Sequence, residues 1–98
     1  MSYLSLIRLK GDTDQLVAQS KEIDEVIDPI AQANGGIFHA IAKTDDGILI
    51  VNLWESKEGS EATANHPEVR RVIEATRGGD GGGAPSFEHF DVPHYVSV

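Results

Sequence analysis

The sequence predicts an α+β fold in the element order β-α-β-β-α-β, with a four-stranded antiparallel sheet covered by helices on one face. Three observations support this prediction. Residues 2–10 alternate in the manner of a strand, residues 36–54 contain two apolar runs around an Asp-Gly turn, and the segments after each show apolar residues at helical spacing. Since the chain has 98 residues, we expect residues 1–98 to form a single small domain.

The first strand should end at Gly11, and Asp12 is a suitable N-cap for a helix that runs to about Asn34. Pro29 removes a backbone N–H and crowds the preceding turn, so a kink or a break is expected there. The helix should end at Asn34-Gly35-Gly36. Its buried stripe is expected to comprise Leu16, Ile23, Val26, Ile27 and Ile30.

A hairpin should follow, with Thr44-Asp-Asp-Gly47 as its turn. Two registers are open: His39 lies opposite Asn52 if Thr44 pairs with Gly47, and opposite Trp54 if Asp46-Gly47 alone forms the loop. Both registers place His39, Asn52 and Trp54 on one face, because side chains alternate along a strand. We expect that face to be open. The purely apolar face should lie under the helices, and it comprises Phe38, Ala40, Ala42, Leu49, Val51 and Leu53.

Ser56 can cap a second helical region, which should be in two pieces because Asn65-His66-Pro67 interrupts it. Residues 78–84 have the composition of a flexible glycine-rich loop. From Pro85 onward, apolar residues predict a last strand that Pro93 interrupts, which is typical of a sheet edge or a bulge.

This order of elements is the ferredoxin-like arrangement. Both faces of the hairpin are apolar, and the helices can cover only one of them. Packing the open face against a second copy would bury Ile37, Ile41, Ile48 and Ile50 of both chains, so a homodimer is expected as the partner state.

The composition restricts the possible partners. A net charge of −8 and a pI near 4.7 repel phosphate backbones and anionic lipid surfaces, so neither nucleic acid nor a membrane is expected as a partner. The absence of cysteines excludes disulfides and thiolate metal sites. The N-terminus has no apolar run of signal-peptide or membrane-spanning length, so we expect a cytoplasmic location.

Three side chains on the predicted open face are candidate site residues. His39 could transfer a proton or orient a carbonyl ligand, Asn52 could hydrogen-bond to a substrate oxygen, and Trp54 could stack on a flat ligand. Each has a structural alternative: His39 and Asn52 can satisfy one another as a buried polar pair, and Trp54 can be part of a core or an interface.

The segments Gly36-Ile-Phe-His39, Asp45-Asp-Gly-Ile48 and Val51-Asn-Leu-Trp-Glu-Ser-Lys-Glu58 resemble the core of the antibiotic biosynthesis monooxygenase-type (ABM-like) dimeric α/β barrel proteins. This resemblance implies a homodimer with a pocket between the helical layer and the sheet for a small apolar or aromatic molecule. It also implies cofactor-free oxidation of a flat, polyketide-like substrate. The chain departs from the family at Gly59-Ser60 and Ala62, where bulkier residues are usual.

Two further patterns are weaker. Haem-degrading proteins of the same superfamily resemble this chain in the order of Trp54 and His66, which makes His66 a candidate substrate-binding residue; however, the first strand lacks their asparagine, and His66 beside Pro67 also suits a helix cap. His89, Asp91 and His94 could bind a metal only if a bulge turned His94 to the same face. We therefore expect no cofactor and no metal, and a non-catalytic ligand-binding or structural dimer remains the alternative.

Overall fold

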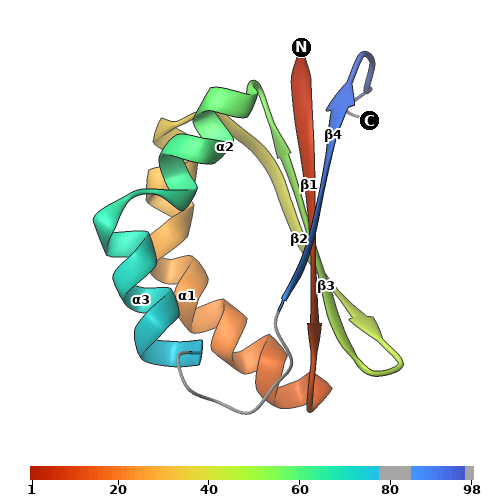
Figure 1. Cartoon of the computed structure of the whole chain (residues 1–98), viewed down its shortest axis with the longest axis vertical. Coiled ribbons are helices and arrows are strands. Elements are labelled where there is room, and N and C mark those ends of the chain that lie inside the picture. Colours follow the sequence, from red (N-terminus) through yellow and green to blue (C-terminus); the bar gives the residue numbers. More distant parts are fainter. Residues whose placement is uncertain (78–84, 97–98) are drawn as a thin grey trace.

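The computed structural model describes residues 1–77 and 85–96. The predicted glycine-rich loop 78–84 lies outside these residues. Four antiparallel strands form one sheet in the order β2-β3-β1-β4, and the helices lie together on one of its faces (Figure 1). The elements are β1 Ser2–Lys10, α1 Thr13–Ala33, β2 Gly36–Thr44, β3 Gly47–Trp54, α2 Lys57–Ala64, α3 Pro67–Arg77 and β4 Ser86–Val92. The predicted ferredoxin-like α+β arrangement is confirmed, including the division of the second helical region.

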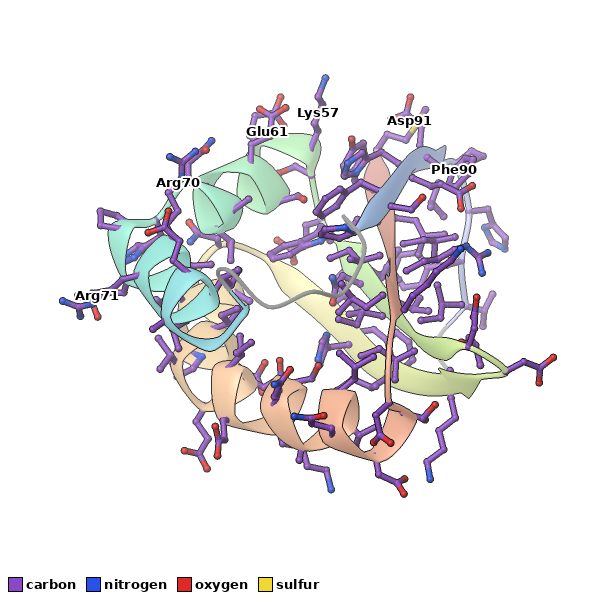
Figure 2. All side chains as sticks on the ribbon, turned by 60° about the horizontal axis from the view of Figure 1, so that its bottom comes forward. Lys57, Glu61, Arg70, Arg71, Phe90 and Asp91 are labelled. Atoms are coloured by element: carbon purple, nitrogen blue, oxygen red, sulfur yellow. The ribbon has the colours of Figure 1, made fainter. Side chains whose placement is uncertain are left out.

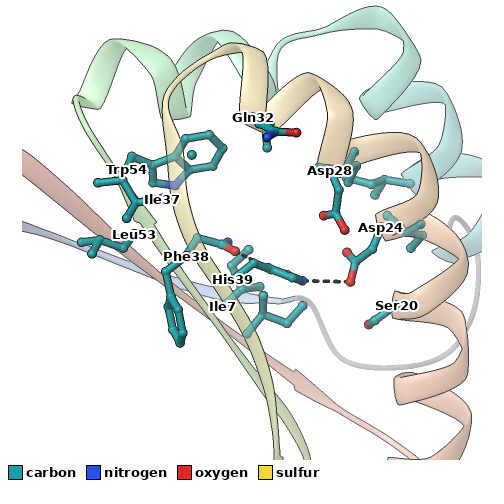
Figure 3. A pocket seen from close by; sticks show the side chains of 17 residues that line it. Ile7, Ser20, Asp24, Asp28, Gln32, Ile37, Phe38, His39, Leu53 and Trp54 are labelled. Carbon is teal, nitrogen blue, oxygen red and sulfur yellow. Dashed lines mark hydrogen bonds and ion pairs between the residues drawn. The ribbon is translucent and has the colours of Figure 1, made fainter. Parts of the chain in front are cut away.

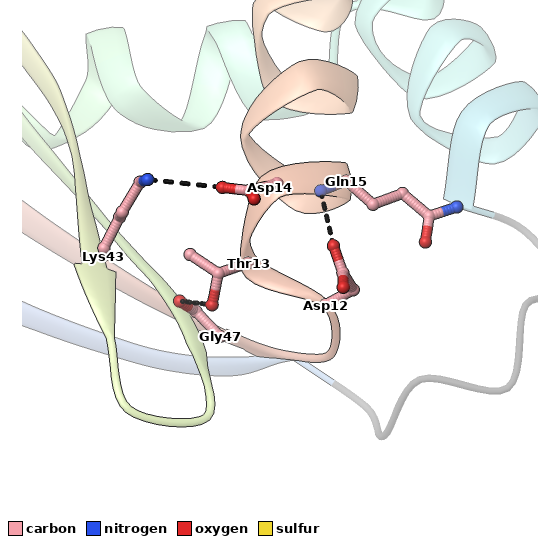
Figure 4. Close-up of polar contacts among 6 residues, drawn as sticks. All are labelled: Asp12, Thr13, Asp14, Gln15, Lys43 and Gly47. Carbon is pink, nitrogen blue, oxygen red and sulfur yellow. Dashed lines mark hydrogen bonds and ion pairs between the residues drawn. The ribbon is translucent and has the colours of Figure 1, made fainter.

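Helix α1 starts where the sequence predicts. The carboxylate of Asp12 accepts a hydrogen bond from the backbone N–H of Gln15 at 2.9 Å, and the Thr13 hydroxyl donates to the carbonyl of Gly47 at 3.2 Å (Figure 4). These contacts fix the N-terminus of α1 against the hairpin. The expected break at Pro29 is absent, since α1 continues through it to Ala33, and Asn34 closes the helix by bonding back to the carbonyl of Ile30.

The hairpin adopts the first of the two registers. Thr44 pairs with Gly47, and His39 lies opposite Asn52. A bulge between Gly36 and Phe38 shifts the far end, so that Gly36 faces Trp54 in place of Ile37. Gly47 has a steric reason to be glycine, since a Cβ there would lie 1.8 Å from the carbonyl oxygen of Leu9.

The predicted assignment of the two sheet faces is wrong. Ile48 and Ile50 are buried with Leu9 in the core, where Leu16 and Val17 of α1 pack against them. Because side chains alternate, the face that carries Ile48 also carries His39, Asn52 and Trp54, and it lies under the helices. The purely apolar set from Phe38 to Leu53 instead forms the open face. His39 and Trp54 can lie on the inner face because Asp24 and Ser5 on that side supply their hydrogen-bond partners.

The open face gains further apolar residues from the neighbouring strands. Leu4 of β1 lies between Leu53 of β3 and Phe90 of β4, and Leu6 lies opposite Val51. Phe38 and Phe90 retain 55% and 46% of their exposure. This continuous apolar surface has no covering element among the described residues.

Ser56 caps α2 by accepting the backbone N–H of Gly59 at 3.2 Å, and α3 begins at Pro67 as predicted. Charged side chains such as Lys57, Glu61 and Arg70 point away from the molecule on the outer side of these helices (Figure 2). The edge strand β4 ends at Val92, one residue before Pro93, and does not resume in the described residues beyond it. Within residues 1–77 and 85–96, no helix is long and apolar enough to cross a membrane.

Candidate functional site

A pocket of about 350 Å³ lies between α1 and the inner face of the sheet. We call it the Trp54 pocket. Figure 3 shows the Trp54 ring on its sheet side and Asp24 and Asp28 extending from α1 toward the same space. Its lining consists of Ile7, Ser20, Ile23, Asp24, Ile27, Asp28, Ala31, Gln32, Gly36, Ile37, Phe38, His39, Ile50, Asn52, Leu53, Trp54 and Ile73.

His39 is held from both sides. Its Nδ1 lies 2.5 Å from Oδ1 of Asn52 on the adjacent strand, and its Nε2 lies 2.8 Å from Oδ2 of Asp24 on α1. The β2–β3 register creates the first contact, since the two residues are directly opposite one another. The second contact joins the sheet to the helix across the pocket. The imidazole therefore has a fixed orientation, with 33% of the side chain exposed.

The surroundings raise the pKa of His39 to about 9. The hydrogen bond to Asp24 is the main cause; partial burial opposes it, while the bond to Asn52 and the charges of Asp24 and Asp28 reinforce it. His39 is thus an imidazolium at neutral pH and donates from both ring nitrogens. It cannot act as a general base there, but it can stabilise negative charge or donate a proton.

Asp28 lies one helical turn after Asp24 on the same side of α1. Partial burial, followed by the charge of Asp24, raises the pKa of the Asp28 carboxyl, while the charge of His39 lowers it. One cation therefore faces two carboxylates, and His39 is paired directly with Asp24 only.

The same three side chains could hold a divalent metal. One ligand atom from each of Asp24, Asp28 and His39 lies within 4.8 Å of the others, which is the only such cluster among the described residues. The second nitrogen of His39 is fixed by Asn52, as is usual for histidine ligands. At neutral pH a metal would have to displace the proton that His39 shares with Asp24.

Trp54 is 6% exposed, and its Nε1–H lies 3.5 Å from the hydroxyl of Ser5 on the paired strand β1. The contact gives the polar edge of the indole a partner inside the fold. Because the ring also lines the pocket, Trp54 combines the core role and the ligand-facing position that the sequence left as alternatives.

The structure brings His39, Asn52 and Trp54 together in one pocket, but not His66. The Nδ1 of His66 accepts the backbone N–H of Glu68 at 3.1 Å, so this residue caps the start of α3. His89 stacks on Tyr3 with ring centroids 5.6 Å apart. Neither Asp91 nor His94 joins it in a metal-binding cluster within the described ranges.

No protein-family model matches the chain, and no curated protein is significantly similar to it. Solved structures are similar over almost the whole chain. A candidate antibiotic biosynthesis monooxygenase from Nitrosomonas europaea has a TM-score of 0.75 at 9% identity, with 98% of this chain and 94% of that one covered. The present chain shares their fold.

Two further structures illustrate the range of proteins with this fold. A dimeric ferredoxin-like protein of unknown function from Jannaschia has a TM-score of 0.67 at 16% identity, covering 94% of this chain and all 100% of that one. A variant of MhuD, with two manganese protoporphyrin IX molecules bound per active site, has a TM-score of 0.69 at 16% identity, covering 98% and 99%. At such identities the likeness establishes the fold alone.

Within this ferredoxin-like fold, sequence reasoning missed the contribution of α1. The buried stripe predicted for this helix includes neither Asp24 nor Asp28. A signal was present: Ser20, Asp24, Asp28 and Gln32 recur every four residues and form a polar stripe beside the apolar one. Ser20 is 2% exposed, so the stripe runs into the interior and is not merely a solvated surface.

Proposed function

We propose that this protein binds a flat, largely apolar small molecule in the Trp54 pocket. The observation that carries the proposal is the pocket itself. Its volume of about 350 Å³ lies in the range of about 300–1,000 Å³ that small-molecule sites occupy. Apolar walls with a few oriented polar groups are also typical of such sites, and here a buried indole shares the lining with His39 and Asn52.

The reaction that we propose for the pocket is oxidation of this molecule by O₂ without a bound cofactor. The fold similarity to candidate antibiotic biosynthesis monooxygenases supports this choice. Such a reaction requires a fixed orientation of the substrate, and His39 would contribute by holding Asn52 in place, since both of its own N–H groups are donated to Asp24 and Asn52. Asn52 would donate its amide N–H to a substrate oxygen, because His39 already occupies its carbonyl oxygen.

We further propose that the protein is a homodimer that packs through the open sheet face. An exposed apolar surface of this kind commonly marks an interface. The surface runs across three adjacent strands and includes Leu4, Val51 and Phe90. The dimeric ferredoxin-like relative from Jannaschia makes the same assembly reasonable for this fold.

Two measurements test the proposal. Native mass spectrometry of freshly purified protein should show a dimer that carries additional mass in each pocket; a clean monomer would refute the dimer. Oxygen consumption should then be measured with the identified ligand, in the native protein and in His39→Gln. Turnover that depends on His39 supports the oxidase reaction, and its absence in both proteins leaves ligand binding without catalysis.

A non-catalytic role is the second candidate function. The observation that favours it is the complete pairing of His39, since both of its ring nitrogens already have partners. In that case, His39 and Asn52 stabilise the fold and shape the pocket. His39→Gln should then lower the free energy of unfolding, and ligand affinity should change only as far as the fold does.

A further inference from the structure

We infer that the Trp54 pocket selects flat ligands that present a hydrogen-bond donor, a hydroxyl or an ammonium group, to the carboxylate of Asp28, and that it discriminates against ligands carrying a carboxylate there. The inference rests on the proposed binding function and specifies its ligand class.

The hydrogen bonds around His39 leave Asp28 as the group that can accept from a ligand. The imidazolium donates one N–H to Asp24 at 2.8 Å and the other to Asn52 at 2.5 Å, so neither remains for a ligand anion. Asp28 makes no hydrogen bond or ion pair with another described residue. Of the two carboxylates, Asp28 is therefore the one with both oxygens available to a ligand, whereas Asp24 has one oxygen paired with His39.

A ligand in the Trp54 pocket meets a net negative charge. The two carboxylates of Asp24 and Asp28 outweigh the single imidazole of His39 in either protonation state of that ring, and no lysine or arginine lines the pocket among the described residues. The surrounding chain adds to this field with its net charge of −8. A ligand carboxylate placed near Asp28 would be repelled, whereas a hydroxyl or ammonium group would form a charge-assisted hydrogen bond.

The positions of Trp54 and Asp28 set the direction in which a flat ligand lies. Asp28 and Asp24 enter the pocket from α1, and the Trp54 ring enters from the sheet (Figure 3). Ile23 and Ile50 are among the apolar residues that line the pocket. A ligand that stacks on Trp54 therefore places its far end near α1, where Asp28 can accept from it.

The test uses the full chain and four naphthalene probes that differ only in one substituent at the 2-position: aminomethyl, hydroxymethyl, methoxymethyl and carboxylate. Trp54 is the only tryptophan, so its indole N–H gives a single resonance that reports on the pocket. We expect the aminomethyl and hydroxymethyl probes to shift this resonance with Kd values at least about tenfold lower than their carboxylate and methoxymethyl counterparts.

Asp28→Asn should remove most of this preference for ammonium over carboxylate. Glu25→Gln is the matched control, because it deletes one charge from α1 outside the pocket lining and should leave the preference intact. Equal affinity for all four probes, or a preference that survives in Asp28→Asn, would overturn the inference but not the proposed binding function. If none of the four probes shifts the Trp54 indole resonance, both the inference and the proposed binding function are refuted. A shift produced by Zn²⁺ alone and lost in Asp28→Asn would assign the carboxylates to a metal and overturn the inference.

Discussion

Replacing Asp24 by asparagine should lower the pKa of His39 from about 9 toward its ordinary value of 6.5, because the hydrogen bond to Asp24 is the largest cause of the raised value. A difference of about 2.5 corresponds to about 3.4 kcal/mol of preference for the charged imidazole, at about 1.36 kcal/mol per pKa unit. The His39 side chain is 33% exposed, so solvent screens the pair, and we expect a net loss of about 1–2 kcal/mol in stability at pH 6.

The sign of the pH dependence follows from the direction of this shift. A pKa that is raised in the folded state stabilises the fold fully below about 6.5, and that contribution is lost as the pH rises through about 9. The difference in stability between the native protein and Asp24→Asn should therefore be largest near pH 6 and vanish near pH 10. It can even reverse there, because neutral His39 would leave Asp24 and Asp28 to repel one another.

Both quantities can be measured directly. NMR titration of the imidazole C–H resonances gives the pKa, with His39→Gln to identify the signal among four histidines, and urea unfolding at pH 6, 8 and 10 gives the stability. Asp14→Asn serves as the control, since Asp14 also lies on α1 but pairs with Lys43 outside the pocket (Figure 4). A His39 pKa near 6.5 in the native protein would refute the reasoning, as would an equal pKa in Asp24→Asn.

Three other substitutions test the fold and the assembly. Gly47→Ala should cost at least about 2 kcal/mol in urea unfolding, because the new Cβ would meet the Leu9 carbonyl 1.8 Å away; a neutral effect would mean that the hairpin packs differently. Ser56→Ala should lower the free energy of unfolding by about 1 kcal/mol through loss of the α2 cap, whereas Ser60→Ala, inside α2, should cost less. Val51→Lys, on the open face, should convert the proposed dimer to a monomer in light scattering, and a dimer that persists would place the interface elsewhere.

Local signals in the sequence were sufficient for most of the fold. Asp12 and Ser56 are short polar side chains before helical spacing, and both act as N-caps. The turn at Asp45-Asp46 limited the hairpin to two registers, one of which places His39 beside Asn52, although neither the choice between them nor the bulge after Gly36 could be predicted. The caps and the turn depend on neighbours in the chain, so residue type and spacing are enough to predict them.

The side of the sheet that the helices cover was not predictable in the same way. Both hairpin faces are apolar, and the assumption that the polar face would be left open gave the wrong answer. The outcome depends on the rotation of α1, which turns Asp24 toward His39. That pairing joins residues far apart in the chain, and the apolar stripe predicted for α1 gives no indication of it. Only the sheet residues of the candidate site, His39, Asn52 and Trp54, were therefore predicted from the sequence. Asp24 and Asp28 of α1 were not.

The corrected faces place the pocket within one chain, so that ligand binding does not require the dimer. With the polar residues on the open face, the pocket would have been formed inside a dimer and would have required it. The observed pocket is instead lined by helices and sheet of one chain. Phe38 and Leu53 of the open face are among its lining residues, whereas Val51 of that face is not. A monomeric Val51→Lys variant should thus retain both the pocket and the pairing of His39 with Asp24. Loss of the raised His39 pKa in that monomer would indicate that the second copy holds α1 in place.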